Sequence, residues 1–183
     1  RTYAVITWRS LMITDEMWDS LILVEGIQLL PLKRFGLTIP DYYVSKCGRV
    51  WSSKTNKWKS VFENWRQKKG VGKPKCYDFS VTTLAKPFRD LGMKYKKKST
   101  TRDTTEFRVK LHQAVKTVWH PLEDYSHEIG ITKEEWDSAP QPFKQLAYDT
   151  VLIDHIDDDV SNNHLSNLQY STPLKNSNFR KLW

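Results

Sequence analysis

Apolar and polar positions first alternate regularly at residues 39–53, IPDYYVSKCGRVWSS. Two runs rich in β-branched and aromatic residues flank the tripeptide KCG, and Gly48 can adopt the positive φ that a tight turn needs. The pattern therefore predicts a β-hairpin. Residues 57–61, KWKSV, continue in the same style and predict a further strand.

The first 38 residues carry apolar segments of two kinds. Residues 3–8, YAVITW, are β-branched and aromatic, which predicts a strand. Residues 13–27 begin with Thr14 as a candidate N-cap and are expected to form a helix. After the predicted hairpin, a stretch rich in Gly and Lys at residues 66–76 is typical of a loop.

Two further segments change their periodicity part of the way along. Residues 77–92, YDFSVTTLAKPFRDLG, alternate like a strand in the first half and then resemble a short helix that ends at Gly92. Residues 106–120 pass from a strand into a helix, with apolar residues at helical spacing. The polar and basic residues 94–106 between them are expected to be mobile.

Residues 131–150 predict a helix start followed by a second turn or helix. The segment begins with a capping box formed by Thr132 and Glu135, and prolines divide it into two parts. The part after the first prolines is expected to be either a turn or a helix.

The last third of the chain predicts two short strands and a final helix. Residues 150–155 and 168–172 are both rich in apolar and β-branched residues. Thr172 followed by Pro173 is a typical helix start, with Thr as the N-cap and Pro at the first helical position. The chain thus predicts a strand-rich region followed by a unit of two strands and a helix, and the predicted fold class is α+β.

Composition indicates a folded, soluble protein. The chain of 183 residues is 39% hydrophobic and contains eight Trp, eight Tyr and seven Phe, which is enough to bury a core. No run of about 18 apolar residues occurs, so no membrane span is predicted. The most apolar stretch, residues 21–32, carries Glu25 and Pro31 and lacks the cleavage site of a signal peptide. Cys47 and Cys76 form no C-x-x-C pair, so we expect reduced thiols in a cytoplasmic protein, with a disulfide as the open alternative.

Charge is distributed unevenly along the chain. Residues 43–118 contain 20 Lys and Arg against 5 Asp and Glu, a net charge of +15, whereas residues 119–183 have a net charge of −6. Trp and Tyr side chains lie among the basic residues, which favours nucleic acid as a partner over an ordinary solvated face. Arg49, Lys54 and Lys57 beside the predicted hairpin turn are candidate phosphate contacts, although any surface hairpin can carry such residues.

One polar run differs from the rest, at residues 154–178, DHIDDDVSNNHLSNLQYSTPLKNSN. Its strand, loop, strand and helix start can bring four side chains to one point: Asp154, His155, Asn167 and Asn176. Carboxylate and amide oxygens suit Mg²⁺ or Mn²⁺. A neutral histidine beside them can accept a proton from an attacking water, and the positive end of a helix attracts phosphate. The cluster therefore predicts hydrolysis of a phosphodiester.

This run resembles the HNH family of ββα-metal (His-Me finger) nucleases, and within it the homing endonucleases of phage introns. The family pattern of Asp-His, an amide pair, Asn-Leu and a final His or Asn is matched in order by Asp154-His155, Asn162-Asn163, Asn167-Leu168 and Asn176. The intervals of twelve residues from His155 to Asn167 and nine from Asn167 to Asn176 are similar to those of the family. Asp158-Asp159 stands where the family usually has Gly-Asn, and Asn176 replaces the final His.

The resemblance implies a role for each matched residue. His155 is expected to be the general base, and Asn167 to orient His155 and tie the loop. Asp154 and Asn176 are expected to hold one Mg²⁺ or Mn²⁺. The Cys pairs that build a structural zinc site in other HNH proteins are lacking, so no structural zinc is expected. His164 in the loop is expected to lie at the surface or to cap the loop.

Two upstream segments extend the resemblance. Residues 39–53 look like the small module that opens many such endonucleases, with Tyr-x-Val-Ser followed by Gly-Arg-Val and Ser. VKLHQAVKTVWHP resembles the helix that precedes their active site, and His112 within it is expected either to be buried or to touch a DNA phosphate. The similarity covers residues 39–120 and 150–178.

Together these features predict three parts. Residues 1–38 form an extension of unknown role, residues 39–110 a basic strand-rich DNA-binding module, and residues 111–183 an HNH nuclease domain with a helical segment inserted at about 121–149. The expected function is metal-dependent, site-specific cleavage of double-stranded DNA by a monomer in the cytoplasm of a phage-infected or bacterial cell. The alternatives are a DNA-binding or regulatory protein that uses this fold without cleaving, and an HNH nuclease of phage packaging or defence.

Overall fold

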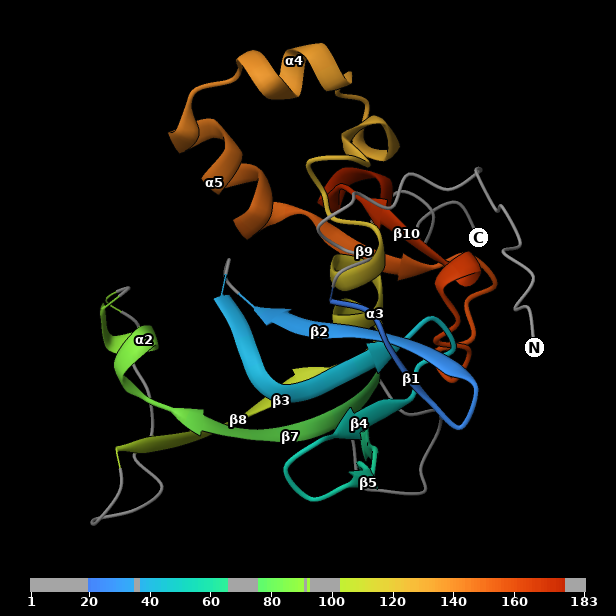
Figure 1. Ribbon diagram of the computed structural model, residues 1–183. Helices are drawn as coiled ribbons and strands as arrows, with labels where there is room; N and C mark the ends of the chain where they lie inside the picture. Colours follow the sequence, from blue (N-terminus) through green and yellow to red (C-terminus); the bar gives the residue numbers. More distant parts are fainter. Residues whose placement is uncertain (1–19, 35–36, 66–75, 91, 93–102, 177–183) are drawn as a thin grey trace, which may run out of the picture.

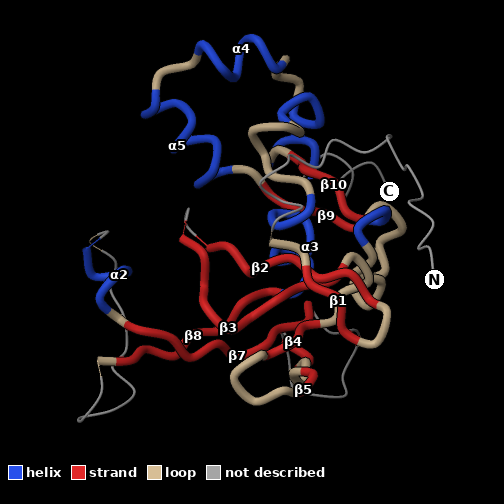
Figure 2. The backbone as a smooth tube through the Cα atoms, viewed as in Figure 1, coloured by secondary structure: helices blue, strands red, loops and turns tan. Residues whose placement is uncertain are grey.

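The computed structural model describes residues 20–34, 37–65, 76–90, 92 and 103–176. It is a mixed structure of antiparallel sheets and short helices, with the strands gathered at one end and the helices α4 and α5 at the other (Figures 1 and 2). The predicted strand at residues 3–8 and the predicted loop at residues 66–76, except for Cys76, lie outside the described residues.

Three antiparallel sheets are present among the described residues. The first has five strands in sequence order: β1 Ile22–Val24, β2 Ile27–Arg34, β3 Leu37–Ser45, β4 Val50–Ser52 and β5 Lys57–Trp58. The second has three strands: β6 Phe62–Asn64, β7 Cys76–Leu84 and β8 Thr104–Lys110. The third is the hairpin of β9 Leu152–His155 and β10 Leu168–Ser171.

The prediction of a helix over residues 13–27 is wrong in its described part. That part forms the hairpin β1–β2, whose two turn residues Glu25 and Gly26 have φ of 53° and 76°. Two successive positive φ angles give a turn whose twist matches that of the flanking strands, and Gly26 adopts such an angle without strain. The sheet thus begins upstream of residue 39, because β2 pairs with β3.

The β3–β4 hairpin and the two mixed segments are confirmed. Gly48 lies in the turn between β3 and β4 with φ of 79°. β7 is followed by the short helix α2, Lys86–Asp90, and Gly92 has φ of 72° just beyond it. β8 runs directly into α3, Leu111–Trp119. α3 ends before His120, because helical geometry is disfavoured for the residue that precedes a proline, here Pro121.

α3 is the element on which the other layers pack. It lies between the larger sheets and the β9–β10 hairpin (Figure 1). Val115 and Val118 of α3 belong to one core cluster with Leu30 of β2, Phe79 of β7 and Leu168 of β10. Each such fully buried side chain contributes about 1.5–3 kcal/mol through burial. The hairpin that carries Asp154 and His155 therefore shares its core with the basic sheets.

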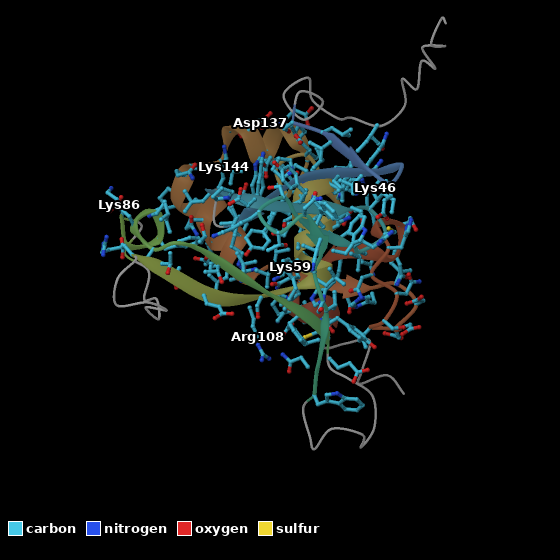
Figure 3. All side chains as sticks on the ribbon, turned by 60° about the horizontal axis from the view of Figure 1, so that its bottom comes forward. Lys46, Lys59, Lys86, Arg108, Asp137 and Lys144 are labelled. Atoms are coloured by element: carbon cyan, nitrogen blue, oxygen red, sulfur yellow. The ribbon has the colours of Figure 1, made fainter. Side chains whose placement is uncertain are left out.

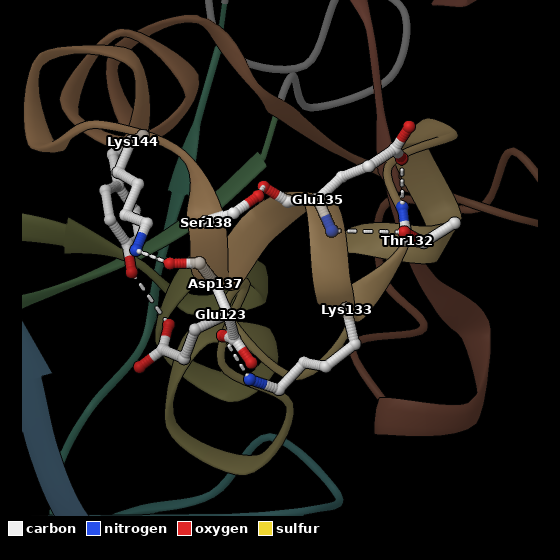
Figure 4. A network of polar contacts seen from close by, with 8 residues as sticks. Glu123, Thr132, Lys133, Glu135, Asp137, Ser138 and Lys144 are labelled. Atoms are coloured by element: carbon white, nitrogen blue, oxygen red, sulfur yellow. Dashed lines mark hydrogen bonds and ion pairs between the residues drawn. The ribbon is translucent and has the colours of Figure 1, made fainter.

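The helical segment between α3 and β9 is held together by capping and by ion pairs (Figure 4). It contains η1 Ser126–Ile129, α4 Lys133–Ser138 and α5 Gln141–Thr150. The predicted capping box is confirmed, since the Glu135 amide donates to Thr132 Oγ1 and the Thr132 amide donates to Glu135 Oε2. Lys144 of α5 donates to the backbone oxygen of Asp137, which joins the two helices.

This segment is anchored to the rest of the protein by a buried ion pair. Lys116 of α3, 1% exposed, donates to Glu128 of η1 at 2.7 Å. The second oxygen of Glu128 accepts from the backbone amide of Tyr170 in β10 at 2.6 Å. Breaking one partner of such a buried pair typically costs about 3–5 kcal/mol, because an uncompensated charge remains. Glu128 thus fixes η1 against both α3 and β10.

Among the described residues, no helix has both the length and the apolar character that crossing a bilayer requires. Both cysteines are free thiols, with Cys76 buried on β7 and Cys47 exposed in the β3–β4 turn. The expectation of reduced thiols agrees with this arrangement.

Candidate active site

The candidate site lies at the end of β9, where the chain leaves the β9–β10 hairpin and enters the β9–β10 loop (residues 156–164). His155 is the last residue of β9 and pairs across the hairpin with Leu168. Its side chain is only 7% exposed and faces α3, where the ring of His112 lies edge-on with the two ring centroids 5.2 Å apart. Successive strand residues point to opposite faces, so Asp154 faces away from α3.

A helix start follows β10, as predicted. Residues 173–176 are helical, and Thr172 Oγ1 accepts a hydrogen bond from the Lys175 amide at 3.3 Å. Thr172 is therefore the N-cap, and Pro173 occupies the first helical position, where its missing amide proton costs nothing. The chain order from residue 152 onward is strand, loop, strand and helical turn.

Asn163 is the residue that contacts His155. Asn163 Oδ1 lies 3.2 Å from His155 Nε2, and both side chains are buried. The amide group of Asn163 donates through Nδ2 to the backbone oxygens of Val160 and Ser161, each at 3.2 Å. These two acceptors fix which end of the amide faces His155. Because Oδ1 can only accept, His155 Nε2 must be the donor.

The second ring nitrogen of His155 is therefore the basic one. In a neutral imidazole with its proton on Nε2, Nδ1 carries the lone pair. Among the described residues His155 Nδ1 makes no hydrogen bond, and it is not one of the fully buried side-chain atoms that lack a partner. A group that removes a proton from water needs a free lone pair, which Nδ1 carries in this tautomer.

Asn167 ties the loop together. Its amide donates to Asp157 Oδ1 at 2.8 Å and to the backbone oxygen of Asn162 at 2.9 Å, and its Oδ1 accepts from the Asp157 amide at 3.1 Å. The backbone oxygen of Asn167 also accepts from the Ile156 amide. The side-chain contact with His155 that we expected of Asn167 is made by Asn163 instead.

Asp157 is the acceptor at the centre of the same loop. It accepts hydrogen bonds from the side chains of Asn162 and Asn167 and from the backbone amide of Asp159. These donors favour the ionised carboxylate and lower the pKa of Asp157 below its usual range. The loop therefore keeps its shape through an ionised carboxylate.

The two predicted metal ligands have side chains that reach the surface. Asp154 on β9 and Asn176 in the helical turn are each partly exposed. Neither side chain makes a hydrogen bond to another described residue. Within the described part of the chain, no group of three or more His, Cys, Asp or Glu side chains converges as a metal site does. A hard cation here would take one carboxylate and one amide oxygen, with water and phosphate oxygens completing its shell.

His112 occupies the first turn of α3 and is 8% exposed. Burial is the main cause that lowers its pKa to about 3, and the neighbouring charges of His155 and Lys110 act in the same direction. Its Nδ1 is buried without a hydrogen-bond partner. Of the two roles expected for His112, burial against His155 is the one that this geometry supports.

The basic residues predicted to touch DNA lie on the edge of the five-stranded sheet. Lys54 and Lys57 are exposed around the β4–β5 connection. Arg49 stacks over the ring of Trp58 at 3.7 Å and forms an ion pair with Glu25 Oε2 at 3.7 Å. Glu25 also accepts from Trp58 Nε1 at 3.1 Å. Arg49 therefore already has an anionic partner within the protein.

Other cations extend this basic surface over neighbouring elements. Figure 3 shows Lys59 after β5, Lys86 in α2 and Arg108 on β8, whereas Asp137 and Lys144 come from α4 and α5. The cations of the sheets are thus spread along the strands rather than gathered at one point.

Sequence reasoning missed Asn163 and Glu25 as contacts. Asn163 was visible as one of two adjacent amides, but the spacing alone gives no reason to prefer it over Asn162 as the partner of His155. Glu25 was assigned to a helix, so its approach to Arg49 across two hairpin turns had no signal in the sequence.

Comparison of the chain with protein-family models, with curated proteins and with solved structures found no match.

Proposed function

We propose that this protein is a metal-dependent DNA endonuclease of the HNH type. The observation that carries the proposal is the hydrogen bond between His155 Nε2 and Asn163 Oδ1, which leaves the lone pair of the neutral ring on Nδ1. The strand, loop, strand and helical turn from residue 152 to 176 support it, as does a strongly basic set of sheets that packs in the same core. Within the HNH class, the homing endonucleases remain our proposed subgroup.

His155 is the proposed general base. Its Nδ1 accepts the proton of the attacking water, and Nε2 stays bonded to Asn163 throughout. Placing a general base in this way typically accelerates a reaction by about 10²–10⁴-fold. The hydrogen bonds between Asp157 and Asn167 and the bond from Asn167 to the Asn162 backbone hold the loop that carries Asn163.

Asp154 and Asn176 are the residues that would hold the divalent cation, Mg²⁺ or Mn²⁺. Both offer an oxygen without a described partner, and hard oxygen ligands of this kind fit these ions. The cation would supply positive charge to the phosphate and to the leaving oxygen. The N-terminus of the helix that begins at Pro173 adds further positive potential.

The proposed substrate is double-stranded DNA bound by the basic sheets. Residues 43–118 have a net charge of +15, and Lys54 and Lys57 are exposed to contact phosphates. Arg49, stacked on Trp58, is available once a phosphate replaces Glu25. The shared core keeps this surface fixed relative to His155.

A second candidate is a DNA-binding protein that uses this fold without cleaving. The burial of His155 at 7% exposure and its packing against His112 favour it, because a purely structural histidine has the same surroundings. The two candidates share the same basic surface. They differ only in whether the protein cleaves the DNA that it binds.

The test is cleavage of supercoiled and phage DNA in Mg²⁺ or in EDTA, with wild type and two single variants. His155→Ala should lose at least about 10²-fold in rate with unchanged DNA affinity, since a lost base removes about 10²–10⁴-fold. His127→Ala is the matched control, because His127 is an exposed histidine of η1 outside the site. DNA binding without cleavage by the wild type in any divalent cation would establish the second candidate instead.

A further inference from the structure

Asn163 is enclosed by three parts of the molecule at once. Its Oδ1 faces His155, and its Nδ2 is held by the backbone oxygens of Val160 and Ser161. Only 6% of the residue is exposed. Turning this amide over would place Oδ1 against two backbone oxygens and would lose both donated hydrogen bonds.

The third part is the β3–β4 turn (residues 46–49) of the basic sheet. A Cβ added at Gly48 would lie 3.1 Å from Asn163 Cβ, which is tighter than most real Cβ contacts, and 3.4 Å from the Asn163 backbone oxygen, so Asn163 would have to move by a few tenths of an ångström. The backbone oxygen of Lys46 accepts from the Leu165 amide at 2.8 Å. The turn itself is braced by Ser45, whose Oγ accepts from the Arg49 amide at 2.8 Å. The absence of a side chain at Gly48 thus lets the turn rest directly on Asn163.

We propose that Asn163 is a positioning residue that keeps the proton of neutral His155 on Nε2, and that the β3–β4 turn holds Asn163 in place through Gly48. The effect on rate rests on the proposed nuclease function, whereas the effect on the tautomer does not. The β3–β4 turn also carries Arg49. Residues 46–49 therefore contact the β9–β10 loop beside His155 and also belong to the surface proposed to bind DNA. The basic sheet therefore contributes to the geometry of the base as well as to affinity.

The first experiment measures the tautomer by ¹⁵N NMR of protein labelled at histidine, with His155→Gln used to assign the signals. In wild type near neutral pH, the neutral form of His155 should carry its proton on Nε2 only, and that proton should be protected from exchange with water. In Asn163→Ala the two ring ¹⁵N shifts should move toward each other and the protected proton should be lost. Asn162→Ala is the control, because Asn162 bonds to Asp157 and not to His155.

The second experiment tests the turn. Gly48→Ala should disturb the His155 signals in the same direction as Asn163→Ala. Gly130→Ala is the matched control, since Gly130 has a similar φ of 84° but open space where a Cβ would lie, whereas Gly48 has φ of 79° and meets Asn163. Backbone strain is alike in both variants, so a change confined to Gly48→Ala reports the contact with Asn163.

The third experiment links the tautomer to catalysis. Asn163→Ala should lower kcat by about tenfold or more and leave DNA affinity unchanged, a smaller loss than removal of the base itself. A proton found on Nδ1 in wild-type His155, His155 signals that do not change in Asn163→Ala, or an unchanged kcat would each overturn the proposal. If the tautomer depends on Asn163 but wild type cleaves no DNA, the positioning part stands and the nuclease function fails by itself.

Discussion

His112 and His155 face each other edge to face, with their ring centroids 5.2 Å apart and an angle of 66° between the ring planes. His112 belongs to α3 and His155 to β9, so the two residues are 43 positions apart in the sequence. Both are more than nine-tenths buried. Two imidazolium charges at this separation would repel each other in a medium of low dielectric constant. The pair is therefore stable only while at least one ring is neutral, and the lowered pKa of His112 identifies that ring.

This pair predicts a loss of stability in mild acid. The pKa of His112 is lowered to about 3 in the folded protein, while an unfolded chain protonates histidine near 6.5. Between these two pH values the unfolded state binds more protons than the folded state. The free energy of unfolding is therefore undiminished by His112 above about pH 6.5 and decreases as the pH falls toward 3. The contribution is up to about 1.4 kcal/mol per pH unit. Urea unfolding from pH 7 to pH 4 measures it.

The variant His112→Leu should flatten that dependence and leave the other titrating groups unchanged. His127→Leu is the control, since His127 is exposed and should keep the wild-type slope. The pKa of His120, lowered to about 4 mainly by burial, adds to the slope in both proteins and cancels in the difference. Identical slopes for wild type and His112→Leu would contradict the assignment.

Much of the local structure was predictable because short-range chemistry decides it. Gly48 between two β-rich runs, the capping box of Thr132 and Glu135, and Thr172 before Pro173 each act within four residues, and each is present in the structure. In the described residues 20–27 the helix prediction failed. There a two-residue turn at Glu25 and Gly26 joins two strands that pairing with β3 stabilises, and pairing between distant strands leaves little trace in a short window.

The candidate site was predictable in its members but not in its contacts. The spacing brought out His155 and Asn167, and both lie in the β9–β10 loop region. Spacing gives no information on which amide turns toward the ring, because that depends on the backbone oxygens of residues 160 and 161 and on the approach of Gly48 from another sheet. The burial of His112 depends likewise on the position of α3.

Because Glu25 forms an ion pair with Arg49, we expect Glu25 to weaken DNA binding. Glu25→Gln should raise DNA affinity by a few fold, since an exposed pair of this kind contributes about 0.2–1 kcal/mol. Arg49 would then neutralise one more phosphate, and the slope of log affinity against log salt should steepen by about 0.9. Glu134→Gln on α4 is the control with the same net charge. The measurement is DNA affinity by fluorescence anisotropy over a series of salt concentrations. Equal slopes for Glu25→Gln and Glu134→Gln would show that Arg49 does not contact the DNA.

The metal ligands predict a graded response to Mg²⁺. Asp154→Ala and Asn176→Ala should both raise the Mg²⁺ concentration needed for half-maximal cleavage, with the larger shift in Asp154→Ala. A carboxylate offers a negative charge as well as an oxygen, whereas an amide offers a neutral oxygen only. Asp149→Ala in α5 is the control, because Asp149 is an exposed acid that bonds to Gln145 away from the site. Metal titrations that overlay the wild-type curve for both variants would exclude the two residues as ligands.

A single base predicts that one chain cuts one strand at a time. The sequence contains one Asp-His…Asn…Asn set, and one His155 can activate one water at one phosphate. A two-metal site needs more carboxylates converging on the centre than Asp154 supplies. Supercoiled plasmid that carries the target should therefore convert to open circles first, with linear DNA appearing later and at a rate that rises with enzyme concentration. Linear DNA that forms as fast as open circles at limiting enzyme would mean that two chains act together on the site, and the expectation of a monomer on DNA would then be wrong.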